Sequence, residues 1–111
     1  MAAHEKLEKD LESRLIESSV NYDFIKRRIN YKVHRKDGEC DLLAIVNDYA
    51  IIVEIKGRDR TKGRKYAMKQ LNKDIDWVRE RYYNVTRIFP MYMYTSKNSK
   101  GYDIEFHPEL L

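Results

Sequence analysis

The sequence predicts a mixed α/β fold in which helices flank a five-stranded sheet, in the order α-β-β-β-α-β-β. Three observations favour this fold: two segments have apolar residues at helical spacing, several segments alternate apolar and polar residues, and one segment is a nearly continuous β-branched run. The second helix can connect two parallel strands, which makes the sheet mixed. With 111 residues, the chain has room for one hydrophobic core and little room for a second. We therefore expect a single domain over residues 1–111.

The first predicted elements are a helix and a strand. Within residues 5–19 the apolar residues recur four apart, at Leu7, Leu11 and Leu15, which is typical of a helix packed on a larger surface. Apolar and polar residues then alternate over residues 24–34, which predicts a strand with one buried face.

Two further strands are predicted from turn residues and β-branched residues. The sequence Lys-Asp-Gly at residues 36–38 predicts a turn, and a second strand follows over residues 39–46. Residues 47–48 are Asn-Asp, which favour another turn. The β-branched run over residues 50–55 predicts a central strand that is covered on both faces. The three strands therefore form a meander.

The C-terminal half is predicted to contain a loop, a helix and two strands. The basic, glycine-containing segment over residues 57–64 predicts a mobile loop. A helix then extends to about Tyr83, with Leu71, Ile75, Val78 and Tyr82 as its core-facing residues. Residues 85–95 predict a fourth strand with an edge position or a bulge at Pro90, and residues 102–107 predict a fifth strand.

The charge distribution favours a nucleic-acid-binding protein. The chain has 22 lysines and arginines against 18 acids, a net charge of +4, and many of the basic residues gather in two stretches. A solvated charged surface is the alternative interpretation of either stretch. The candidates for contacts with the DNA backbone are Arg58, Arg60, Lys62, Arg64, Lys65, Arg35 and Lys36.

Several functional classes do not fit the sequence. A single cysteine, Cys40, excludes an internal disulfide and a cysteine-rich zinc site, and no glycine-rich phosphate loop precedes a helix, which argues against a nucleotide cofactor. His4, His34 and His107 have no ligand spacing, so we expect surface or strand-edge positions for them. The N-terminus is charged and no run of about eighteen apolar residues occurs, so we expect a cytosolic protein without membrane contact.

Two acids and a lysine form the candidate site. Glu54 and Lys56 lie two apart on the most apolar predicted strand, so both side chains leave the same face. If residues 47–48 form a two-residue hairpin turn, Asp41 lies opposite Glu54, with Cβ atoms about 5 Å apart. Adjacent carboxylates favour a divalent cation such as Mg²⁺, and a lysine beside them can assist phosphodiester hydrolysis. A solvated ion-pair cluster explains the same spacing equally well.

These residues resemble the PD-(D/E)XK nuclease superfamily. Residues 39–41, Glu-Cys-Asp, place an acid thirteen positions before the Glu-Ile-Lys of residues 54–56, and a helix with Gln70 and Leu71 follows. In size and spacing the chain is most similar to small archaeal and viral Holliday-junction resolvases, and the resemblance covers nearly the whole chain. It implies a restriction-endonuclease-like fold. One departure is that Cys40 stands where the name-giving proline would be.

The resemblance implies a role for each matching residue. Asp41 and Glu54 would bind the metal, with the backbone carbonyl of Ile55 as a further ligand. Lys56 would assist the attacking water.

The superfamily usually adds a glutamate from the first helix. Glu12 is our choice because it follows an apolar residue, Leu11, as the superfamily's acid does, and Glu8 fits almost as well. Either can also be an ordinary solvated acid. Gln70 resembles a glutamine that some members place near the site, although a glutamine on a helix surface is at least as common.

We therefore expect a Mg²⁺-dependent, structure-selective DNA endonuclease of the Holliday-junction resolvase type, in which Mn²⁺ substitutes for Mg²⁺. Symmetrical cutting of a four-way junction needs two active sites, so we expect a homodimer that binds branched DNA in the cytoplasm of a prokaryotic cell or virus-infected host. Two alternatives stay open: a less selective nuclease of the restriction or repair type, and a DNA-binding or assembly module that keeps the fold without turnover.

Overall fold

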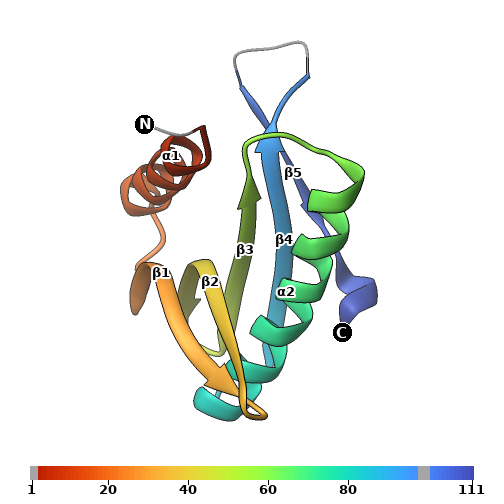
Figure 1. Ribbon diagram of the computed structural model, residues 1–111. Coiled ribbons are helices and arrows are strands. Elements are labelled where there is room, and N and C mark those ends of the chain that lie inside the picture. Colours follow the sequence, from red (N-terminus) through yellow and green to blue (C-terminus); the bar gives the residue numbers. More distant parts are fainter. Residues whose placement is uncertain (1–2, 98–100) are drawn as a thin grey trace.

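The computed structural model describes residues 3–97 and 101–111, and its elements follow the predicted order (Figure 1). A mixed five-stranded sheet flanked by two helices confirms the predicted fold class. The elements are α1 Ala3–Glu17, β1 Phe24–Val33, β2 Lys36–Val46, β3 Tyr49–Lys56, α2 Thr61–Arg81, β4 Arg87–Thr95, β5 Tyr102–Phe106 and the 3-10 helix η1 Pro108–Leu110.

The five strands lie in the sheet in chain order, β1-β2-β3-β4-β5. β3 and β4 are parallel, and the other neighbours are antiparallel. Parallel neighbours need a crossover between them, and α2 provides it along the β3–β4 pair (Figure 1). β3 is therefore the central strand, as its β-branched run predicted.

The two helices cover opposite faces of the sheet. Leu11 of α1 belongs to a cluster with Leu42, whereas Leu71 of α2 belongs to a cluster with Leu43. Leu42 and Leu43 face different helices because successive side chains of a strand point to opposite sides. The sheet is therefore the middle layer, and both of its faces are covered.

The β1–β2 turn lies at His34 and Arg35, so the turn predicted at residues 36–38 is wrong. Both turn residues have positive φ, 51° and 64°, as a two-residue hairpin turn requires. Gly38 lies inside β2 opposite Tyr31, and a Cβ at this position would collide with the Tyr31 ring. This glycine therefore permits a close contact between a ring and the backbone, which the sequence does not distinguish from a turn.

The β2–β3 turn lies at residues 47–48, as predicted. The ladder runs outward from this turn and ends at the pair Leu42 and Val53. These pairs have the register that the sequence predicted, and Asp41 and Glu54 are the next residues beyond the last pair. The hairpin therefore carries an acid of each strand to the same end of the sheet.

β4 is an interior strand, so the edge position predicted for Pro90 is wrong. β4 lies between β3 and β5, and Pro90 pairs with Ile52 of β3. The Pro90 carbonyl accepts a hydrogen bond of 2.9 Å from the backbone N–H of His107, just beyond β5. The N and O of one strand residue point to the same side of the strand, so the nitrogen of Pro90 faces β5. Because β5 ends at Phe106, no β5 residue needs the N–H that Pro90 lacks.

α2 begins at Thr61, so the loop after β3 is shorter than the predicted one. Arg64, the expected end of the loop, lies in the first turn of α2, where its N–H donates to the Arg60 carbonyl at 2.8 Å. β4 begins at Arg87, two residues after the predicted start. Within the two described ranges, neither α-helix has the length and apolar character to cross a membrane.

Candidate metal centre

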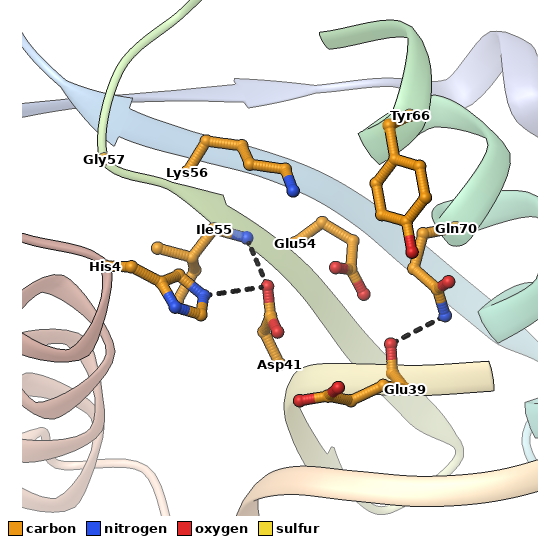
Figure 2. A pocket seen from close by; sticks show the side chains of 9 residues that line it. All are labelled: His4, Glu39, Asp41, Glu54, Ile55, Lys56, Gly57, Tyr66 and Gln70. Carbon is orange, nitrogen blue, oxygen red and sulfur yellow. Dashed lines mark hydrogen bonds and ion pairs between the residues drawn. The ribbon is translucent and has the colours of Figure 1, made fainter. Parts of the chain in front are cut away.

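A pocket of about 340 Å³ opens at the end of β3, beyond its last pair with β2. Its side chains come from α1, β2, β3 and α2 (Figure 2). The three residues singled out in the sequence, Asp41, Glu54 and Lys56, share this pocket. The residues that line it are His4, Glu39, Asp41, Glu54, Ile55, Lys56, Gly57, Tyr66 and Gln70.

Asp41 reaches the pocket because β1 and β2 are irregular at this point. Arg28 has a φ of 53°, and the β1–β2 register omits the pair that Arg28 would form with Asp41. Cys40 and Leu43 both belong to the α2-side core, although residues three apart on a regular strand face opposite sides. The alternation therefore shifts near Asp41, whose Oδ2 accepts a hydrogen bond of 2.8 Å from the backbone N–H of Ile55.

Glu54 is a buried acid in an acidic surrounding. It is 4% exposed, and its Oε1 has no hydrogen-bond partner among the described residues. Burial and the neighbouring carboxyls of Asp74 and Asp41 raise the pKa of Glu54 well above its usual range. A buried carboxylate is costly in free energy unless a proton or a cation neutralises it. Glu54 is therefore suited to bind a cation.

Lys56 covers the same pocket from the end of β3 (Figure 2). Its Nζ lies 4.7 Å from the centre of the Tyr66 ring of α2, a distance typical of a cation–π contact. This contact holds the ammonium group beside the carboxylates and near the opening. From there it can donate hydrogen bonds to a water molecule or to a phosphate oxygen.

Glu8 and His4 of α1 lie beside Asp41. Glu8 is fully buried, and its carboxylate lies with the Asp41 carboxylate and the His4 imidazole within 4.8 Å of one another. Glu12 lies one helical turn further along α1 and pairs with Arg27 at 3.2 Å. Glu8, rather than the expected Glu12, is thus the α1 glutamate that lies beside Asp41. His4 was expected at the surface, but its Nε2 lies 3.3 Å from Asp41 Oδ2 and 3.4 Å from Glu8 Oε2.

Cations on the α1 side partly offset these acids. Glu8 Oε1 accepts a hydrogen bond of 3.2 Å from Arg28 Nε, and Arg27 approaches the same oxygen at 3.6 Å. Burial nevertheless raises the pKa of Glu8, against the lowering effect of Arg28. The hydrogen bond with Asp41 raises the pKa of His4.

α2 adds a polar network on the other side of Glu54. Gln70 Nε2 donates to the Glu39 carbonyl at 2.6 Å and to Asp74 Oδ1 at 3.1 Å, and the Tyr31 hydroxyl donates to the same Asp74 oxygen. Burial raises the pKa of Asp74 to about 6. Among the described residues, no hydrogen-bond donor reaches Asp74 Oδ2. Gln70 therefore lies at the pocket, as considered from the sequence, together with an acid that was not considered.

The donor set suits a hard divalent cation. Asp41, Glu54 and Glu8 offer carboxylate oxygens, and the buried Glu8 Oε2 and Glu54 Oε1 have no hydrogen-bond partner within the described part of the chain. No protein-family model, curated protein or solved structure matches this chain. The chemistry of the site is therefore inferred from its own residues.

Most of the basic residues proposed to contact DNA are exposed. Four of them follow the pocket along the chain, in the β3–α2 connection and the first turns of α2, and two others lie at or next to the β1–β2 turn. Lys73 Nζ of α2 donates a hydrogen bond of 3.0 Å to the Asp37 carbonyl, next to this turn. The turn therefore lies near the C-terminal half of α2, at the opposite end of the helix from the pocket (Figure 1). The exposed residues are Arg58, Arg60, Lys62 and Lys65 near the pocket and Arg35 and Lys36 near the turn.

Arg64 differs from the other residues of that set because it is partly buried and paired with two acids. Its guanidinium donates two hydrogen bonds of 2.7 Å to Glu105 of β5 and bonds of 2.9 and 3.0 Å to Asp59. It also lies over the Tyr92 ring, 5.0 Å from its centre. We call Arg64, Asp59 and Glu105 the Arg64 clasp. The clasp ties the start of α2 to the edge strand, so Arg64 has a structural role.

Two residues of the site were missed in the sequence although a signal was present. Asp74 and Gln70 lie four apart beside the apolar stripe of α2, and polar residues at buried positions of a helix often mark a site. His4 and Glu8 are also four apart, which places both on one face of α1. Each pair has a spacing that brings two polar groups together.

Proposed function

We propose that this protein is a metal-dependent endonuclease that hydrolyses phosphodiester bonds in DNA, with Mg²⁺ or Mn²⁺ as its cofactor. One observation carries the proposal: the buried carboxylates of Asp41 and Glu54 share a solvent-accessible pocket with Lys56. Buried acids favour a bound cation, and a lysine beside them suits a reaction in which negative charge builds up on a phosphate. A solvated ion-pair cluster would leave Glu54 exposed, whereas its carboxyl is buried among other acids.

Each residue of the pocket has a role in this proposal. Asp41 and Glu54 hold the cation, with the Ile55 carbonyl as a further ligand and Glu8 beside Asp41 on α1. When bound, the cation supplies positive charge for the phosphate and lowers the pKa of a water molecule. Lys56 orients the attacking water or donates a hydrogen bond to a phosphate oxygen. The hydrogen bond from Ile55 N–H supports this arrangement because it fixes the Asp41 carboxylate.

Exposed basic residues near the pocket support a nucleic-acid substrate over a small phosphate ester. Arg58 and Arg60 follow β3 directly, and Lys62 and Lys65 lie in the first turns of α2. Positive side chains along one edge bind a sugar-phosphate backbone by releasing its counterions. Selectivity for branched DNA and a homodimer belong to the same proposal, because symmetrical cutting of a four-way junction needs two active sites.

Cleavage assays with isosteric variants test the proposal. Purified protein with Mg²⁺ or Mn²⁺ is expected to cut at least one of four substrates: a four-way junction, a flap, a linear duplex and a single strand. Asp41→Asn and Glu54→Gln should lower the cleavage rate by about 100-fold or more while DNA binding persists. Glu80→Gln, an exposed glutamate on α2, is the matched control and should cut normally.

The outcomes separate the alternatives. Cutting of all four substrates at similar rates indicates a less selective nuclease. Salt-sensitive DNA binding without metal-dependent cutting indicates a binding or assembly module. Normal cutting by Asp41→Asn or Glu54→Gln contradicts the proposed site, and a monomer in light scattering, with and without a four-way junction, contradicts the homodimer.

A further inference from the structure

We propose that His4 is a metal ligand and that the site consequently prefers Mn²⁺, or a transition-metal ion of similar chemistry, over Mg²⁺. The His4 imidazole would join the carboxylates of Glu8 and Asp41 on the ion that Glu54 and the Ile55 carbonyl approach from β3. The inference rests on the proposed function because it names the ion that the same pocket uses. It adds a nitrogen ligand that the sequence did not indicate.

The packing of α1 holds His4 at the pocket. Leu7 and Leu11 are buried between α1 and the sheet, and Arg28 of β1 binds Glu8 at 3.2 Å. These contacts fix the turn of the helix that follows His4. Since His4 precedes Glu8 by four residues, both side chains leave the same face of α1, toward Asp41.

The distances at this place suit one shared ion. His4 Nε2 lies 3.3 Å from Asp41 Oδ2 and 3.4 Å from Glu8 Oε2, and the three donor atoms lie within 4.8 Å of one another. Adjacent ligand atoms around an octahedral ion with bonds of about 2.2 Å are about 3.1 Å apart. The imidazole and Asp41 face each other at the edge of the pocket (Figure 2). Small side-chain movements would bring all three atoms onto one ion.

The state of the Glu8 carboxylate is a second observation that points to a ligand. Glu8 is fully buried, and its Oε1 interacts with Arg28 and Arg27. Its Oε2 has no hydrogen-bond partner in the described ranges, and it faces His4. A buried carboxylate oxygen without a donor is costly, and a metal ion supplies the missing partner.

The imidazole nitrogen decides which ion fits best. Mg²⁺ and Ca²⁺ prefer oxygen ligands, whereas first-row transition metals also accept imidazole nitrogen. Mn²⁺ binds carboxylates well, so a set of one nitrogen and several oxygens favours it among the ions common in nuclease sites. The competing explanation is a protonated His4 that only neutralises the two carboxylates. That explanation predicts no bond between the imidazole and a metal.

Pulsed electron paramagnetic resonance of the full chain with Mn²⁺, without DNA, tests the inference. A directly bound imidazole gives a ¹⁴N coupling in the Mn²⁺ spectrum. We expect this coupling in the wild type and in His34→Ala, and we expect it to be absent in His4→Ala. His34 is the matched control because it is an exposed histidine in the β1–β2 turn, outside the pocket.

Calorimetric titration of the same proteins gives the selectivity. His4→Ala should weaken Mn²⁺ binding by about tenfold or more and change Mg²⁺ binding by less than about threefold. A wild-type Mn²⁺ spectrum without ¹⁴N coupling overturns the inference, and so does a coupling that persists in His4→Ala. Equal loss of Mn²⁺ and Mg²⁺ affinity in His4→Ala overturns the selectivity.

The metal-binding experiment and the cleavage experiment test different proposals, so each proposal can be rejected without the other. A protein that binds Mn²⁺ through His4 and cuts no DNA keeps this inference and removes the nuclease proposal. A protein that cuts DNA and shows no ¹⁴N coupling keeps the nuclease proposal and removes His4 as a ligand.

Discussion

Two acid clusters of the protein have pKa shifts in opposite directions. At the pocket, Glu54 is buried, Asp74 is buried beside it, and burial raises the pKa of both. In the Arg64 clasp, the guanidinium lowers the pKa of Asp59 and lowers that of Glu105 to about 2. The clasp acids therefore stabilise the folded state when they are ionised, whereas the pocket acids destabilise it.

The difference comes from the partners of each cluster. Both acids of the clasp accept charge-assisted hydrogen bonds from one cation. Asp74, which is buried beside Glu54, accepts hydrogen bonds from Tyr31 and Gln70, which are neutral donors and do not offset its charge. The sign of the pKa shift thus separates an ion pair that supports the fold from acids that are suited to a ligand.

Arg64→Met is expected to give the largest change in stability. It leaves the Asp59 and Glu105 carboxylates without their shared cation, and we expect a loss of about 2 kcal/mol in the free energy of unfolding at pH 7, measured by urea denaturation. Unchanged stability would remove the structural role of the clasp.

The pH dependence sharpens this test. The folded-state pKa of Glu105, about 2, lies below its usual value of 4.5, so the contribution of the clasp is complete above about pH 4.5. It is lost as the pH falls toward 2. Arg64→Met should therefore lose less stability than the wild type over this range, and an equal loss in both proteins contradicts the assignment.

Asp74→Asn is expected to have the opposite effect. The folded-state pKa of Asp74, about 6, lies above its usual value of 3.8, so the wild type loses stability as the pH rises through 6. Asparagine does not titrate, and its amide oxygen still accepts hydrogen bonds from Tyr31 and Gln70. Between pH 5 and pH 8, with a chelator present, the variant should lose about 1.4 kcal/mol less stability than the wild type.

The control for this prediction is Asp76→Asn. Asp76 is an exposed acid on the same helix, and this substitution should leave the pH dependence unchanged. His4 and Glu8 also have raised pKa values, but they are present in all three proteins, so the differences report Asp74 and its neighbour Glu54. Parallel curves for Asp74→Asn and the wild type contradict the prediction.

The smallest expected effect distinguishes the clasp arginine from an exposed one. Arg58→Ala should change the stability by less than about 0.5 kcal/mol. If the proposed function holds, the variant should also lower the slope of log affinity for DNA against log salt concentration by about one. Arg79→Ala, an exposed arginine in the C-terminal part of α2, is the control. Equal changes in both variants argue against a DNA contact at Arg58.

The order of elements and the approach of Asp41 to Glu54 could be predicted because both depend on local patterns. A two-residue turn at residues 47–48 fixes the hairpin register, and counting outward is then enough. The turn before β2 was misplaced because Gly38 looks like a turn residue, while its role is to accept the ring of Tyr31.

The contribution of α1 could not be predicted in the same way. Glu8 and Glu12 are one turn apart on the same face, and a shift of about 6 Å along the helix axis decides which of them meets Asp41. That shift depends on how α1 packs on the sheet. The role of Arg64 was equally hard to predict, because its partner Glu105 is 41 residues away and no local pattern distinguishes Arg64 from Arg58.

The bond from Ile55 N–H to Asp41 decides which substitution of Asp41 leaves the pocket in its native shape. The β2–β3 ladder ends at Leu42, and beyond it the Asp41 side chain acts as the acceptor for the N–H of Ile55. Alanine at this position would free that buried N–H, so the strand end could move and the variant would no longer represent the native pocket. Asparagine keeps an oxygen in the same place, which makes Asp41→Asn the better protein for crystallisation.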